Sequence, residues 1–270
     1  MSETLIHHTS LSGKYPAIIL IHGMACDESD WALQARHFAE LGHQVVTVDL
    51  RGHGQSTHIN TDLTMQQMGA DVAAVLRSLN VTRAIVVGHS MGCRVATETA
   101  LNAPDMVVGV ALIDGSRFAK GDAASAISNT RATIDKLGWE AHMQATFKSM
   151  FLADADQQRR QAIIDRALAR PPCIGIPIML AMVEWDASDF DRRYAQLCVP
   201  VQVLQSSHVN SKRKRVTMTD DMVIPWHQDL IDAGVNAVVE RVQECGHFTM
   251  LDEPGRVNAT LEALLLRCAQ

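Results

Sequence analysis

The chain lacks an excess of positive charge and any long apolar run. Its 24 lysines and arginines stand against 30 aspartates and glutamates, which gives a net charge of −6 over 270 residues. This balance excludes bulk attraction to nucleic acid or to an anionic membrane. No apolar run approaches the length that a membrane-spanning helix needs. We therefore expect neither nucleic acid nor a membrane as a partner.

Paired cysteines are also absent. The six cysteines form no Cys-x-x-Cys pair and are scattered over positions 26, 93, 173, 198, 245 and 268. Such spacing is typical of reduced thiols and argues against a disulfide or zinc framework. Residues 1–8 lack the basic region and the apolar run of a signal peptide. These features predict a cytoplasmic protein.

A Gly-x-Ser-x-Gly motif stands between a strand-like and a helix-like segment. The β-branched run 85–87 leads into Gly88-His89-Ser90-Met91-Gly92, and the helix-forming run 94–101 follows. In this context the motif predicts a nucleophile elbow, a sharp strained turn that exposes the serine hydroxyl. Glycine is needed because only a residue without a Cβ lets the flanking backbone pass so closely. The alternative is a glycine-rich turn with an incidental serine. We favour Ser90 as a nucleophile.

Strand-like and helix-like segments alternate along most of the chain, which predicts an α/β fold with a mostly parallel sheet. A short first strand is expected at 5–9, and further strands at 17–21, 44–50, 84–87, 107–113, 199–205 and 237–242. No strand pattern occurs between 116 and 194, where helices are expected at 123–137, 139–151, 154–169 and 176–183. We therefore predict a core domain of residues 1–115 and 195–270 with a helical cap, 116–194, inserted into it.

Three motifs stand at the ends of expected strands, namely Leu20-Ile-His-Gly-Met-Ala25, Gly88-His-Ser-Met-Gly92 and Cys245-Gly-His-Phe248, and 49–56 matches the pattern Asp-x-Arg-Gly-x-Gly-x-Ser. With these motifs together, the chain resembles the α/β-hydrolase fold superfamily, in its serine esterase/lactonase-like group. The likeness covers nearly the whole chain outside the cap. It implies a mostly parallel central sheet flanked by helices, an inserted helical cap and hydrolytic chemistry at Ser90.

The chemistry requires partners for the serine. A neutral hydroxyl is a poor nucleophile, so an imidazole must take its proton during attack on a carbonyl. The resemblance assigns this role to His247, which follows the last strand. The oxyanion formed on attack needs preorganised N–H donors. The resemblance assigns these to the backbone amides of Met24 and Met91.

The triad acid is where the chain departs from the commonest pattern of the family. Most relatives have a carboxylate just after the strand expected at 199–205, but this chain continues Gln205-Ser-Ser-His-Val-Asn210 and then turns basic. Asn210 could orient an imidazole but could not offset its positive charge. Asp220 and Asp221 are the nearest carboxylates, and they lie far from the strand end.

Asp114 is the acid that we favour. It ends the apolar run 107–113, and some members of the fold place the acid after this strand. There it would hold His247 in the right tautomer and stabilise the imidazolium. The alternative is a turn or helix-capping aspartate, because Asp-Gly is a strong turn signal by itself.

We expect no metal and no cofactor. His7, His8 and His53 lie outside the spacings of zinc ligands, and His53 is more simply a residue that braces its loop. The loop after the strand at 17–21 lacks the lysine and the second glycine of a phosphate-binding loop. Relatives that resemble dehalogenases and epoxide hydrolases have a carboxylate at the elbow, where this chain has Ser90.

Substrate choice should lie mostly in the cap, whose methionines and aromatic residues predict a deformable apolar pocket. Trp185 is the cap residue that we expect on the pocket wall, and Cys26 and His89 are further candidates. A buried inert thiol is the favoured alternative for Cys26. The basic run 212–215 could meet a substrate carboxylate, although a solvated loop is the favoured reading.

The sequence therefore predicts a serine hydrolase that cleaves a small, largely apolar carboxylic ester or lactone through an acyl-enzyme. A small-molecule substrate is the expected partner, and the chain is expected to be a monomer or a homo-oligomer. Three alternatives remain open. They are a C–C bond hydrolase of ring-cleavage products, a cofactor-independent oxygenase on the same fold, and a ligand-binding protein.

Overall fold

One seven-stranded sheet forms the centre of the molecule, in a computed structural model that describes residues 5–210, 215–219 and 221–269. The strand order is β1-β3-β2-β4-β5-β6-β9. The edge strand β1 pairs antiparallel with β3, and the pairs that follow are parallel. The bounds are β1 (His8–Leu11), β2 (Lys14–Ile21), β3 (His43–Val48), β4 (Ala84–His89), β5 (Val107–Ile113), β6 (Val201–Gln205) and β9 (Ala237–Arg241).

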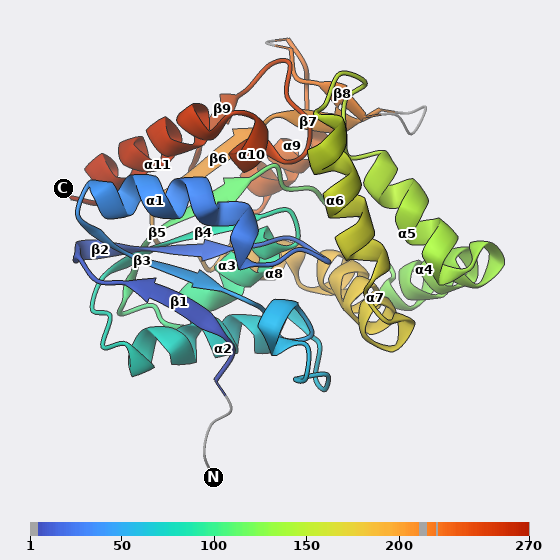
Figure 1. Cartoon of the computed structure of the whole chain (residues 1–270), viewed down its shortest axis with the longest axis horizontal. Helices are drawn as coiled ribbons and strands as arrows, with labels where there is room; N and C mark the ends of the chain where they lie inside the picture. Colours follow the sequence, from blue (N-terminus) through green and yellow to red (C-terminus); the bar gives the residue numbers. More distant parts are fainter. Residues whose placement is uncertain (1–4, 211–214, 220, 270) are drawn as a thin grey trace.

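Helices cover both faces of this sheet (Figure 1). One face carries α1 (Ala32–Glu40) and α11 (Pro254–Cys268), and the other carries α2 (Met65–Ser78) and α3 (Gly92–Asn102). Because both faces are covered, the central strands are continuous apolar runs. Residues 17–21 of β2 and 84–87 of β4 are 0% exposed. The buried sheet therefore fixes the carboxyl ends of β2, β4, β5 and β6 side by side.

Five helices connect β5 to β6: α4 (Ala123–Leu137), α5 (Trp139–Lys148), α6 (Gln157–Leu168), α7 (Pro172–Ser188) and α8 (Phe190–Tyr194). We call residues 123–194 the helical insert. Figure 1 shows α4 to α7 gathered beyond one end of the sheet. The insert is fastened to α3 by a buried ion pair, in which Arg94 Nη2 lies 2.6 Å from Asp186 Oδ2.

The predicted parallel sheet is confirmed, and the strandless segment holds helices as expected. The first strand lies at His8–Leu11, later than the predicted 5–9, because pairing with Val45–Val48 of β3 sets its position. Helix α7 (Pro172–Ser188) extends further in both directions than the predicted 176–183. The antiparallel hairpin of β7 (Ser207–Val209) and β8 (Arg215–Thr217) was not predicted.

Short elements complete the loops around the sheet. They are the 3-10 helices η1 (Glu28–Trp31) and η2 (Gly54–Ser56) and the helices α9 (Pro225–Asp232) and α10 (Thr249–Asp252). None of the described helices is by itself long and apolar enough to cross a membrane. By length and composition α6 and α7 would pass that test as a pair, although they meet at an angle of 99°.

Candidate active site

Ser90 stands on a strained turn between β4 and α3. Its φ is +55°, a left-handed conformation that is unfavourable for any residue with a side chain. A Cβ on Gly88 would lie 2.1 Å from the carbonyl oxygen of Gly92, and a Cβ on Gly92 would lie 2.7 Å from the carbonyl oxygens of Ile21 and His22. The two glycines are therefore required for the backbone to turn here, and the turn places Ser90 at the carboxyl end of the sheet.

His247 contacts Ser90 from the loop between β9 and α10. The distance between His247 Nε2 and Ser90 Oγ is 2.9 Å, within reach of a hydrogen bond from the hydroxyl to the ring. The backbone of His247 is fixed by the insert, because its N–H donates to the carbonyl of Met150 at 3.0 Å. The side chain of His89 supports the same loop by donating from Nε2 to the carbonyl of His247 at 2.8 Å.

Asp114 faces the other nitrogen of the same ring. Its Oδ2 accepts from His247 Nδ1 at 2.6 Å, so the ring carries its proton on Nδ1 and presents Nε2 to Ser90 as an acceptor. Asp114 follows β5, the neighbour of β4 in the sheet, which explains why residues distant in sequence meet. The structure thus brings Ser90, His247 and Asp114 together in one hydrogen-bonded chain.

The loop after β6 supplies hydrogen-bond donors to Asp114. Oδ1 accepts from the backbone N–H groups of Ser206 and Ser207, each at 2.9 Å. It also accepts from Gln205 Nε2 at 3.0 Å, and the hydroxyl of Ser207 donates to Oδ2 at 2.7 Å. Where the commonest family pattern has a carboxylate, this chain therefore has serines that fix a carboxylate from the adjacent strand.

The arrangement shifts two pKa values. Burial alone would raise the pKa of Asp114, but the hydrogen bond from His247 and the charges of His247 and Arg215 outweigh it, and the pKa falls to about 2. Burial, followed by the charge of Arg215, lowers the pKa of His247, while Asp114 acts in the opposite direction. At neutral pH the carboxylate is ionised and the imidazole is neutral. These are the states that a general base and its orienting acid need.

The loop after β2 lies against the elbow. A Cβ on Gly23 would be 3.2 Å from the Cβ of Ser90, so this glycine permits the close approach. Met24 is 8% exposed and Met91 is 0% exposed. Among the described residues, no protein acceptor is bonded to the backbone N–H of Met24 or of Met91. Met91 directly follows the serine, and Met24 directly follows Gly23 in the loop that approaches it.

Two buried histidines brace this loop. His53 Nε2 accepts from the N–H of Ala25 at 3.1 Å, and its Nδ1 donates to the carbonyl of Arg51 at 3.0 Å. His22 accepts from the N–H of Leu50 at 3.1 Å. Burial is the largest cause that lowers the pKa of both rings, to about 4 for His22, so both act as neutral hydrogen-bonding groups.

The three pocket candidates occupy different places. The His89 ring lies 4.7 Å from that of His247, centroid to centroid. Cys26 is 2% exposed, and burial followed by the charge of Asp30 raises its pKa, which favours an inert thiol. Trp185 is 1% exposed and donates from Nε1 to Glu98 at 2.7 Å. Its ring is therefore buried where α7 packs on α3. It does not lie on a pocket wall, as the sequence had suggested.

Arg215 is the site residue that the sequence did not single out. The basic run 212–215 was expected as a solvated loop; residues 212–214 lie outside the described residues, but the side chain of Arg215 is only 11% exposed. Its Nη1 donates to Ser207 Oγ at 2.6 Å and lies 3.5 Å from Asp114 Oδ2. The expectation of a solvated loop is therefore wrong for this residue, because the folded β7–β8 hairpin turns it inward.

One group of side chains has the spacing of a metal site, although no metal was expected. The ligand atoms of His7, Glu28 and Asp49 lie within 4.8 Å of one another at the β1 edge of the sheet. The two carboxylate oxygens of Asp49 accept from the backbone N–H groups of Glu28 and Gln55 at 2.9 and 2.8 Å. Because both oxygens of Asp49 bind backbone N–H groups of η1 and η2, we assign this cluster a structural role in holding the two short helices.

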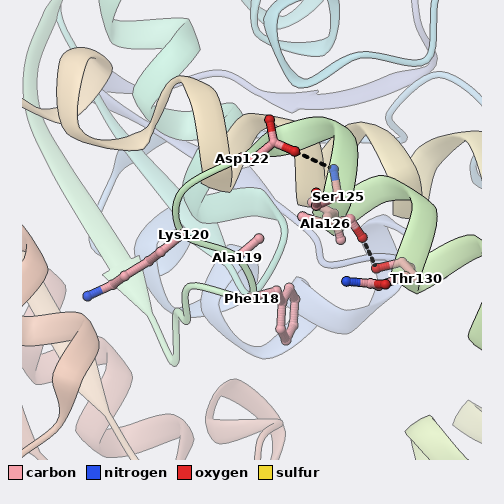
Figure 2. Close-up of a pocket in the computed structure, with 9 residues that line it drawn as sticks. Phe118, Ala119, Lys120, Asp122, Ser125, Ala126 and Thr130 are labelled. Carbon is pink, nitrogen blue, oxygen red and sulfur yellow. Dashed lines mark hydrogen bonds between the residues drawn. The ribbon is translucent and has the colours of Figure 1, made fainter.

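A separate cavity of about 380 Å³ lies between the segment before α4, α4 itself and α7. Figure 2 shows Phe118 and Thr130 on its wall and the side chain of Lys120 extending away from them. Lys120 pairs with Asp229 of α9. Neither Ser90 nor His247 lines this cavity, so it is distinct from the hydrogen-bonded chain described above.

Known proteins of similar sequence include hydrolases. Over 110 residues the chain is 36% identical to a Haemophilus influenzae protein provisionally named an esterase/lipase, a match that covers 41% of this chain but only 38% of that protein. Over 260 residues it is 26% identical to a provisionally named carbamate hydrolase of Variovorax paradoxus, which covers 93% of this chain and 92% of the relative.

Solved structures show the same architecture. A thermophilic esterase from Thermogutta terrifontis superposes with a TM-score of 0.79 at 20% identity, over 98% of this chain and 94% of that one. At this identity the likeness establishes the fold, and the sequence establishes the family. The model of the alpha/beta hydrolase family matches residues 18–260, and the chain belongs to this family.

Proposed function

We propose that the protein is a serine hydrolase that cleaves a carboxylic ester or lactone through Ser90, His247 and Asp114. The observation that carries the proposal is the unbroken hydrogen-bonded chain, with 2.9 Å between Ser90 Oγ and His247 Nε2 and 2.6 Å between His247 Nδ1 and Asp114 Oδ2. Membership of the alpha/beta hydrolase family supports hydrolysis as the reaction class.

The geometry supports a two-step mechanism. Ser90 Oγ attacks the substrate carbonyl while His247 Nε2 takes the hydroxyl proton, and Asp114 holds the ring and offsets its new charge. The N–H groups of Met24 and Met91 donate to the oxyanion. His247 then returns the proton to the leaving alcohol. A water molecule, deprotonated by the same ring, cleaves the acyl-enzyme and restores Ser90.

The helical insert is proposed as the cap that selects the substrate. Its backbone contacts the site at Met150, whose carbonyl accepts the N–H of His247 at 3.0 Å. The ring of Phe151 stacks on Phe248 with 5.1 Å between centroids, so the insert packs against the residue that follows the histidine. The methionines and aromatic residues of the insert are the basis for proposing a small, largely apolar substrate.

Turnover of short p-nitrophenyl esters by wild type, Ser90→Ala and Asp114→Asn tests the proposal. We expect wild type to turn over, and kcat to fall by about 10³-fold or more in both variants, because the nucleophile or the orienting acid is lost. Asp135→Asn, on an exposed face of α4, is the matched control and should keep wild-type kcat.

Each of the other possible results contradicts one part of the proposed function. Wild-type kcat in Asp114→Asn would remove Asp114 from the mechanism. An enzyme inert to esters but active on a vinylogous ring-cleavage acid would favour C–C hydrolysis. Oxygen consumption that survives Ser90→Ala would favour the oxygenase, and ligand-induced thermal stabilisation without turnover would favour a binding protein.

A further inference from the structure

Arg215 joins three parts of the candidate site. Besides its contacts with Ser207 and Asp114, its Nε donates to the carbonyl of Ser149 at 3.1 Å. Ser149 caps the carboxyl end of α5 and precedes Met150, whose carbonyl accepts the N–H of His247. Figure 1 shows β8 beside the link between α5 and α6. One guanidinium therefore connects the β7–β8 hairpin, the helical insert and the Asp114 carboxylate.

Around the Asp114 carboxylate, positive groups outnumber negative ones when His247 is protonated. Asp114 is the one carboxylate within ion-pair distance of Arg215 in the described part of the chain. The same carboxylate must also offset the charge of His247 when the ring is protonated during the reaction proposed above. Two cations then share one buried anion, so the positive charge of Arg215 opposes protonation of the ring.

We propose that Arg215 is a positioning residue for the proposed reaction, which fixes the Asp114 carboxylate against His247 and keeps the imidazole neutral through its charge. It acts directly, at 3.5 Å from Asp114 Oδ2, and through Ser207, which accepts from Arg215 and donates to the same oxygen. Arg215 does not itself have to touch the substrate. The role of Arg215 in turnover rests on the proposed function. Its effect on the protonation of the His247 ring does not.

Other titratable groups face the same pair. His89 at the end of β4 lies beside the His247 ring, and burial followed by the charge of His247 lowers the pKa of His89 to about 3, so it stays neutral. The charge of Arg215 also acts on His208 of β7, whose pKa is lowered by burial first and by that charge second. From α10, Asp252 accepts from the backbone of Gly246 and is paired with Arg159. Asp114 and Arg215 are thus the two charges that act most directly on His247.

The test measures the titration of His247 by NMR of the imidazole ring, assigned from the signal lost in His247→Gln. Arg215→Met removes the charge and the donors, Arg215→Gln keeps amide donors without the charge, and Arg215→Lys keeps the charge. We expect the pKa of His247 to rise by about one unit in the Met and Gln variants and to stay near wild type in the Lys variant. Arg131→Met, an exposed arginine of α4, controls for the change in net charge.

Turnover supplies the second readout. If the ester hydrolysis proposed above occurs, the acid limb of kcat/KM moves to higher pH by the same amount. On that limb the Met and Gln variants then lose about tenfold in kcat/KM, with a smaller change on the plateau. Circular dichroism at each pH shows over which range a variant stays folded, and within that range a shifted limb reports the protonation of His247 and not a loss of structure.

An unchanged His247 titration in folded Arg215→Gln would overturn the inference, and so would an equal shift in Arg131→Met. If Arg215→Met does not fold, the Gln and Lys variants still decide the result. If wild type turns over no ester, the proposed function fails, whereas the ring titration still decides whether Arg215 controls the protonation of His247.

Discussion

At the scale of single residues, the strained turn at Ser90 depends on the absence of side chains around it. Ser90 has a φ of +55°, and the strain is maintained because β4 and α3 are both fixed by packing. Gly88 and Gly92 make the turn sterically feasible, and Gly23 allows the loop after β2 to approach the serine. The position of the hydroxyl is thus determined by backbone contacts.

We predict that Gly88→Ala lowers the free energy of unfolding by about 3 kcal/mol, because its Cβ would meet the Gly92 carbonyl at 2.1 Å. Gly255→Ala is the matched control. No heavy atom lies within 4 Å of its Cβ position in α11, so alanine should stabilise the helix by about 0.5–1 kcal/mol. Urea denaturation of both variants measures the difference, and a Gly88→Ala variant as stable as wild type would contradict the steric argument.

At the scale of elements, a polar joint holds the helical insert on α3. Arg94 donates two hydrogen bonds to Asp186 at 2.8 and 2.6 Å, and their side chains are 2% and 0% exposed. Asp186 also accepts from the N–H of Phe118 at 2.7 Å. A buried pair of this kind adds little net stability by itself, but it is costly to break because one charge is left without a partner.

We predict that Asp186→Asn lowers the free energy of unfolding by about 3–5 kcal/mol, since it leaves the Arg94 guanidinium buried without a counter-charge. The double variant Arg94→Met/Asp186→Leu should recover most of that loss. Asp135→Asn, in the exposed pair with Arg131, should change stability by no more than about 0.5 kcal/mol. Thermal and urea melts of the four proteins test this, and equal losses in Asp186→Asn and Asp135→Asn would refute it.

At the scale of the whole molecule, buried neutral histidines make the fold sensitive to acid. Burial is the largest cause that lowers the pKa of His22 to about 4, of His89 to about 3 and of His53 well below 6.5. In the unfolded chain these groups return to about 6.5. Below that pH the unfolded state binds more protons than the native state, so native stability falls as the pH falls.

We predict that His22, His53 and His89 together make unfolding easier by up to about 4 kcal/mol per pH unit between roughly pH 6 and pH 4.5, because they bind protons in the unfolded state but not in the native state. The low pKa of Asp114 extends the loss toward about pH 2, because protonation of this carboxylate favours unfolding. Denaturant melts across this range measure the slope. His89→Gln should reduce it by about one proton.

The sequence by itself determined the α/β architecture and the positions of the elbow and the last loop. Strand runs such as 17–21 and 107–113 are apolar because both faces of the sheet are buried, so local pattern is sufficient to find them. The glycines around Ser90 are a local steric requirement, and they are visible in the sequence for that reason. The alternation of strands and helices then places the carboxyl ends of the parallel strands at one edge of the sheet.

Only the tertiary structure decided what surrounds Asp114. The donors Ser206 and Ser207 and the cation Arg215 reach this carboxylate across the sheet and from the β7–β8 hairpin, and no local pattern encodes such contacts. The position of Trp185 could not be predicted from the sequence either, because an apolar ring suits a pocket wall and a contact between helices equally well. Its place at Glu98 follows from the way α7 packs on α3. Contacts between distant segments depend on packing, and packing is a property of the whole chain.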